Sequence, residues 1–66
     1  MIIRVNGEEK YFKDGFTIED VLNELKIKPE GMAVDLNRGI IPKRLYNNTM
    51  LKDGDTVEIV KMTGGG

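Results

Sequence analysis

The sequence contains neither cysteine nor histidine. Without cysteine there is no disulfide, no thiolate nucleophile and no thiolate ligand for a metal ion. Without histidine the chain lacks the side chain that most often serves as a general base or a metal ligand near neutral pH. Lysine, acidic and tyrosine side chains remain, but no motif brings a nucleophile and a base together. We therefore expect that the chain is not an enzyme and binds no metal ion or cofactor of its own.

The sequence also lacks long apolar runs and clusters of basic residues. No run approaches the roughly 18 apolar residues that a membrane-spanning helix needs, and no signal-type segment opens the chain. The 10 basic and 11 acidic residues leave a net charge of −1, which gives no electrostatic attraction to nucleic acid. We expect a cytoplasmic protein with no membrane partner and no nucleic-acid partner.

The residues that are present describe one small folded domain. Of the 66 residues, 39% are hydrophobic and 32% are charged, a balance typical of soluble globular proteins rather than disordered ones. A domain of this size buries a modest core and leaves no room for a large catalytic cleft. We expect it to fold by itself and to be a monomer when free.

The chain ends in Gly64, Gly65 and Gly66. Three residues without a Cβ atom can enter a channel too narrow for any side chain. From Met62 the extended chain reaches roughly 13 to 14 Å, which suffices to place the Gly66 carboxylate inside a partner protein. A disordered end or a remnant of cloning is the alternative interpretation. We interpret residues 63–66 as a flexible tail for threading and residues 1–62 as the domain that presents it.

The N-terminal segment predicts a β-hairpin. Apolar side chains alternate along residues 1–5, and Asn6-Gly7 supplies residues that tolerate positive φ in a turn. A two-residue turn sets Ile3 opposite Lys10, whereas a four-residue loop sets Ile3 opposite Phe12, which suits a buried face better. We expect the longer loop.

A helix is expected over residues 17–26. Thr17 can cap it, and Asp20 can reach back to complete a variant of the capping box. Lys26 suits the negative end of the helix dipole, and Pro29 prevents continuation. One apolar stripe follows the helical period: Ile18, Val21, Leu22 and Leu25.

The remaining segments predict short strands. Val34 and Leu36 alternate with polar residues in a third strand, and Arg38-Gly39 then turns the chain into an edge strand, Ile40-Ile41. Residues 43–50 show no clean period and are expected to be irregular, with at most one helical turn. A last strand with Val57 and Ile59 on one face, and Val60 and Met62 on the other, leads into the tail.

Two charged groups invite a functional interpretation. Asp53 and Asp55 flank a glycine, but they lack the further oxygen ligands of a calcium loop, so turn chemistry is the preferred interpretation. Lys43 and Arg44 form an isolated basic pair, which is usually solvated surface. We retain Lys43 and Arg44 as partner-binding candidates.

The expected order of elements describes an α+β domain: a mixed sheet with one helix on one face, and the first and last strands paired in parallel at its centre. This is the order of the β-grasp (ubiquitin-like) fold. Several short motifs occur along it in a fixed order: the Asn-containing hairpin turn, Gly15-Phe16-Thr17-Ile18, Val34-Asp35-Leu36-Asn37, Ile41-Pro42-Lys43, Tyr46, Asp53-Gly54-Asp55 and the terminal glycines. In these motifs the chain resembles the ThiS-type sulfur-carrier proteins of thiamin (thiazole) biosynthesis. Gly64 adds a third glycine to the pair that this family needs, and Lys43 followed by Arg44 blurs where the family's usual Arg after Pro falls.

The resemblance implies a carrier that other enzymes act on. An adenylyltransferase related to E1 enzymes would activate the Gly66 carboxylate with ATP. A cysteine desulfurase or sulfurtransferase would supply sulfur to form a thiocarboxylate, and thiazole synthase would consume it. Val60 and Met62, on the open side of the sheet beside the tail, are candidates for partner binding because exposed apolar surface favours a covering partner.

Three other functions stay open. A carrier for molybdopterin formation or another thiolation pathway would use the same tail chemistry. A ubiquitin-like modifier would form an isopeptide with a lysine of its target. An interaction module with a fortuitous glycine end would bind its partner without the tail.

Overall fold

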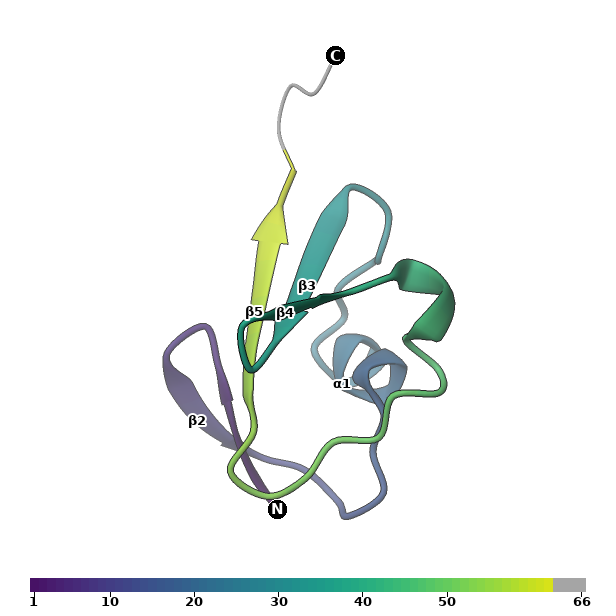
Figure 1. Ribbon diagram of the computed structural model, residues 1–66. Coiled ribbons are helices and arrows are strands. Elements are labelled where there is room, and N and C mark those ends of the chain that lie inside the picture. The colour runs from purple at the N-terminus through teal and green to yellow at the C-terminus, as the bar shows by residue number, and fades with distance from the viewer. Residues whose placement is uncertain (63–66) are drawn as a thin grey trace.

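One mixed sheet of five strands and one α-helix make up the fold in the computed structural model, which describes residues 1–62 (Figure 1). The strand order is β2-β1-β5-β3-β4; β1 and β5 are parallel and the other neighbours antiparallel. The helix lies on one face of the sheet, so the expected α+β class and the central parallel pair are confirmed. The elements are β1 (Ile2–Val5), β2 (Glu8–Tyr11), α1 (Ile18–Glu24), β3 (Met32–Leu36), β4 (Gly39–Ile41), the 3₁₀ turn η1 (Lys43–Leu45) and β5 (Thr56–Lys61).

The first hairpin closes with a two-residue turn, and the expected longer loop is wrong. Ile3 lies opposite Lys10, because Asn6 and Gly7 both adopt positive φ, 50° and 86°. Two such residues form the tight turn whose twist matches that of the flanking strands. Burial does not set this register, because β2 is an edge strand with largely exposed side chains, and Phe12 enters the core one residue after β2 ends.

The second hairpin, between β3 and β4, also closes with a two-residue turn of positive φ. Asn37 and Arg38 have φ values of 50° and 72°, and Leu36 pairs with Gly39. The turn therefore lies one residue earlier than Arg38-Gly39, because an asparagine accepts the left-handed conformation at the first position. β4 is an edge strand and η1 is a single turn, as expected.

The helix is shorter than expected at both ends. The capping box is confirmed, since the Thr17 hydroxyl accepts from the Asp20 N–H (3.2 Å) and the Asp20 carboxylate accepts from the Thr17 N–H (2.9 Å). Residues 17, 25 and 26 lie outside the helix. Lys26 has φ 60° and donates to Asn23 O, while Ile27 donates to Leu22 O, which is the Schellman ending. The helix therefore ends before the chain reaches Pro29.

The core fills the space between the sheet and α1. Tyr46 and Leu51 close it where the chain passes from η1 to β5, although the sequence of this segment has no clean period. The most completely buried side chains come from three strands and from one stripe of the helix: Ile3, Ile18, Val21, Leu22, Val34 and Val57.

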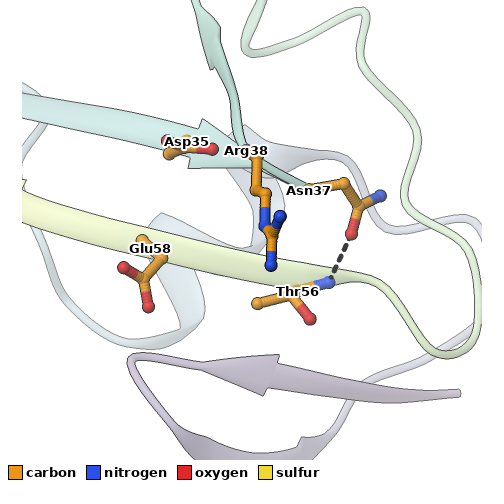
Figure 2. Close-up of a pocket in the computed structure, with 5 residues that line it drawn as sticks. All are labelled: Asp35, Asn37, Arg38, Thr56 and Glu58. Carbon is orange, nitrogen blue, oxygen red and sulfur yellow. Dashed lines mark hydrogen bonds between the residues drawn. The ribbon is translucent and has the colours of Figure 1, made fainter.

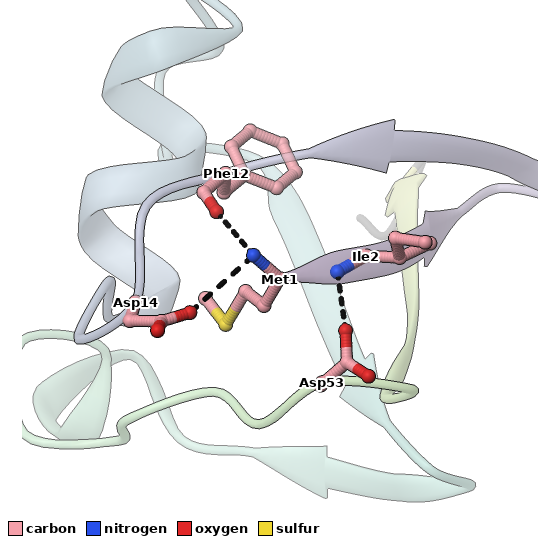
Figure 3. A network of polar contacts seen from close by, with 5 residues as sticks. All are labelled: Met1, Ile2, Phe12, Asp14 and Asp53. Atoms are coloured by element: carbon pink, nitrogen blue, oxygen red, sulfur yellow. Dashed lines mark hydrogen bonds and ion pairs between the residues drawn. The ribbon is translucent and has the colours of Figure 1, made fainter.

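The start of the chain is held by polar contacts (Figure 3). The Met1 ammonium donates to Phe12 O over 2.8 Å and lies 3.4 Å from the exposed carboxylate of Asp14. The N–H of Ile2 donates to the Asp53 carboxylate over 2.6 Å. Asp53 thus serves the fold, fastening the turn before β5 to the first strand.

The left-handed Lys26 gives a stability prediction. A side chain costs about 1 to 2 kcal/mol in this conformation, so Lys26→Gly should raise the free energy of unfolding by about 1 kcal/mol. For a domain of this size the midpoint of thermal unfolding should rise by roughly 4 to 8 °C. Lys28→Gly removes the same charge at an exposed position without positive φ, so calorimetry should find no gain for it. Equal effects of the two changes would contradict this account.

Candidate functional site at the root of the tail

Strand β5 carries the chain from the core to residue 62. Val57 and Ile59 face α1 and are buried, whereas Val60 and Met62 are 54% and 62% exposed. Val60 lies opposite Ala33 of β3. Val60 therefore lies on the open side of the sheet, and Met62 follows directly at the end of β5 from which the tail continues.

Met62 and Lys43 both line one groove. It has a volume of about 370 Å³ and is lined largely by apolar side chains, among them Met32, Ile40 and Met62. Lys43 also lines it, with its ammonium 3.7 Å from the Glu30 carboxylate. We call Val60, Met62 and Ile40 the tail-root patch.

Arg44 does not join this patch. It lines a different hollow, between α1 and η1, together with Glu19, Asn23 and Tyr46. Lys43 lines both hollows, whereas Arg44 lines only the one between α1 and η1. Of the two, only Lys43 lies where a partner that covers Met62 would meet it.

A polar hollow that the sequence did not predict lies on the open face of the sheet (Figure 2). Its volume is about 460 Å³, and Asp35 and Glu58 lie directly opposite each other in it, on β3 and β5. One carboxylate oxygen of Asp35 is buried and has no hydrogen-bond partner within residues 1–62. The alternation around Val34 indicates that Asp35 faces away from the helix, but pairing it with Glu58 requires the strand register.

The hollow belongs to the hairpin that supports β5. Asn37 accepts a hydrogen bond from the Thr56 N–H over 2.9 Å (Figure 2). It also donates one to the Asp55 carboxylate over 3.0 Å. Asp55 also accepts from the Lys52 N–H over 2.7 Å. Asp53 and Asp55 therefore act as turn acceptors. Within residues 1–62 no group of three acidic side chains gathers to hold a metal ion.

The glycine tail itself lies outside the described residues. This applies to the predicted threading residues Gly64 and Gly65, to the predicted modification site at Gly66, and to the expected flexibility of residues 63–66. Among the residues that the structure describes, no helix is long and apolar enough to cross a membrane.

The fold defines the class of protein. A five-stranded mixed sheet that grasps one helix, with the first and last strands parallel at its centre, is the ubiquitin-like β-grasp arrangement. The crystal structure of a thiamine biosynthesis protein (ThiS) from Geobacter metallireducens superimposes on it with a TM-score of 0.90, at 30% identity over the full length of both chains. The expected fold is confirmed.

Sequence comparison gives the family. The model of the ThiS family matches residues 3–66, and the chain belongs to this family. The sulfur carrier protein ThiS of Bacillus subtilis is 36% identical over 66 residues, with 98% of this chain and the whole of that protein covered. A thiazole synthase of Paramagnetospirillum magneticum is 41% identical over 66 residues, which span all of this chain and a fifth of that protein. The resemblance noted in the sequence is confirmed.

The like-charged pair in the polar hollow gives a second prediction. Carboxylates directly opposite each other on neighbouring strands repel, so Glu58→Lys should stabilise the domain by about 0.2 to 1 kcal/mol. The gain should shrink at high salt, because Glu58 is exposed. In an Asp35→Asn background the same change should gain less, and denaturant unfolding of the four chains gives the coupling. An undiminished gain in that background would rule out the pair as its source.

Proposed function

We propose that this protein is the sulfur carrier of thiazole formation in thiamin biosynthesis, and that Gly66 carries the sulfur as a thiocarboxylate. The observation that carries this proposal is the ThiS-family match over residues 3–66, which includes the terminal glycines. The chain itself performs no catalytic step. It presents its terminal carboxylate to enzymes that do.

The chemistry requires activation first. An α-carboxyl group has an ordinary pKa of about 3.3 to 3.7, so at neutral pH it is an anion that resists nucleophilic attack. In the proposed first step a carboxylate oxygen of Gly66 attacks the α-phosphorus of ATP and pyrophosphate leaves. The acyl-adenylate then has a good leaving group, AMP.

Sulfur transfer follows from the adenylate. The terminal sulfur of a persulfide attacks the Gly66 carbonyl carbon and AMP departs, which leaves an acyl disulfide. A second thiol of the enzyme then cleaves the S–S bond, so that an enzyme disulfide forms and the thiocarboxylate is released. This chain has no cysteine, so no internal thiol competes for the activated terminus.

The proposed partners follow from these steps. An E1-like adenylyltransferase binds ATP and the tail, and a cysteine desulfurase or sulfurtransferase supplies the persulfide. Thiazole synthase is the proposed acceptor, supported by the relative of that name in which a segment like this chain makes up a fifth of the protein. A carrier and the enzyme that consumes its sulfur gain effective concentration when they share one polypeptide.

The tail gives the central prediction. Gly65→Val should fold but be a poor substrate, because a branched side chain collides with a channel matched to glycine. Deletion of Gly66 should abolish transfer by withdrawing the carboxylate about 3.5 Å from the phosphorus. Intact mass after reaction with ATP, the activating enzyme and a sulfur donor should show one oxygen replaced by sulfur in the wild-type chain alone.

Thermal unfolding serves as the control for both variants, since neither change touches residues 1–62. Sulfuration of both variants at the wild-type rate would refute the threading role of the tail. A wild-type chain that no such enzyme modifies would refute the carrier assignment. Conjugates of higher mass in cell extract would point to a protein modifier instead.

The tail-root patch gives a prediction about docking. A partner that receives the tail passes over Val60 and Met62. Burial of these side chains would remove apolar surface from water, which favours binding. The double change Val60→Ser and Met62→Ser should weaken binding to the adenylating enzyme roughly tenfold or more. Tyr11→Ser, a matched loss at a 77% exposed position on β2, should bind as the wild type does. Equal affinities of the two variants, measured by calorimetry, would exclude the patch.

A further inference from the structure

Strand β5 loses one of its two neighbours before it ends. On one side β3 accompanies it to Lys61, which lies opposite Met32. On the other side β1 pairs with it only at Thr56 and Val57. Figure 1 shows the upper part of β5 standing beyond the β1–β2 hairpin, with β3 alongside it on the other side only.

In the turn of that hairpin, the side chain of Asn6 takes the next pairing position along β5. The N–H of Ile59 donates to the Asn6 carboxamide oxygen over 2.8 Å, and the Asn6 amide nitrogen donates to Ile59 O over 3.2 Å. These two bonds copy the pair that a neighbouring strand would make. Asn6 therefore extends the β1 side of the ladder by one position after the backbone of β1 has turned away.

The position after Ile59 is open. Asp55 O and Val57 O accept from β1-side N–H groups, as Ile59 does through Asn6, so alternate residues of β5 face this edge. Lys61 is the next in that series. Among the residues that the structure describes, neither its N–H nor its C=O has a partner there.

The open edge is held in an extended conformation. Met62 donates to Gly31 O over 2.8 Å, and its neighbours in β5 pair with β3 up to Lys61. An extended strand with free N–H and C=O groups on one edge is a template for another strand. Because its backbone is already ordered, pairing here costs little conformational entropy on this side.

We propose that an extended segment of the adenylating enzyme adds to this edge at Lys61. The inference rests on the proposed function, which requires an enzyme to receive the chain directly after Met62. Asn6 fixes the register: it occupies the position at Ile59, so the added strand can begin only beyond it. Val60 and Met62 flank the same site, so strand pairing and the tail-root patch would act on one partner surface.

Backbone substitution at Lys61 tests the proposal in the full-length chain. The chain can be assembled by ligation at Met32–Ala33, with cysteine in place of Ala33 and later desulfurisation that restores the natural sequence. N-methylation of Lys61 removes the donor and obstructs the edge, so it should weaken binding to the adenylating enzyme by more than about tenfold. Replacing the same amide by an ester removes the donor without adding a methyl group to the edge, and should weaken binding roughly two- to tenfold.

Glu9 provides a matched control on the opposite edge. Since Val5 pairs with Glu8 across the two-residue turn, the Glu9 amide points away from β1, at an exposed position of an edge strand. The same two changes at Glu9 should leave binding and adenylation as in the wild type. Unchanged thermal unfolding of all four chains excludes a folding defect.

The outcomes separate this inference from the proposed function. If the Lys61 variants bind and are adenylated as the Glu9 variants are, strand addition is overturned while the carrier function stands. If the wild-type chain itself is neither bound nor adenylated, both are overturned. If the wild type forms dimers that N-methylation of Lys61 abolishes, and enzyme binding is unaffected, the edge serves a second copy of the chain and the proposed occupant is wrong.

Discussion

The structure depends on the burial of β5 between two neighbours. Val57 is almost fully buried under α1, and its strand pairs with β1 on one side and with β3 on the other. The last strand of the chain is therefore the centre of the sheet. A segment placed there can carry an extension without fraying, because the free energy of the whole core holds its base.

Two asparagines reinforce this arrangement from opposite sides. Asn6 and Asn37 each sit at the first position of a tight turn with positive φ, and each reaches the backbone of β5. In these positions asparagine both tolerates the turn and supplies a donor and an acceptor. Glycine would satisfy the first requirement and not the second.

The sequence predicted best where a local pattern and a local interaction coincide. The capping box at Thr17 and the alternation that buries Val57 and exposes Val60 both depend on residues close in the chain. Two predictions were wrong. The register at Ile3 was predicted from burial, but the conformation of the turn decided it. The end of the helix was misplaced because no composition rule signals a left-handed lysine at position 26. The pairing of Asp35 with Glu58, and the side chain of Asn6 at Ile59, needed the register of strands far apart in sequence.

The direction of the central pair has a mechanical consequence. Because β1 and β5 are parallel, the start of β1 and the end of β5 lie at opposite ends of the sheet (Figure 1). A force that pulls residue 62 away from the N-terminus therefore loads the bonds between these strands in shear, all at once, instead of opening them one after another. A pull on the tail would therefore act on the β1–β5 bonds in the geometry that best resists their separation, and the domain would move as one rigid body.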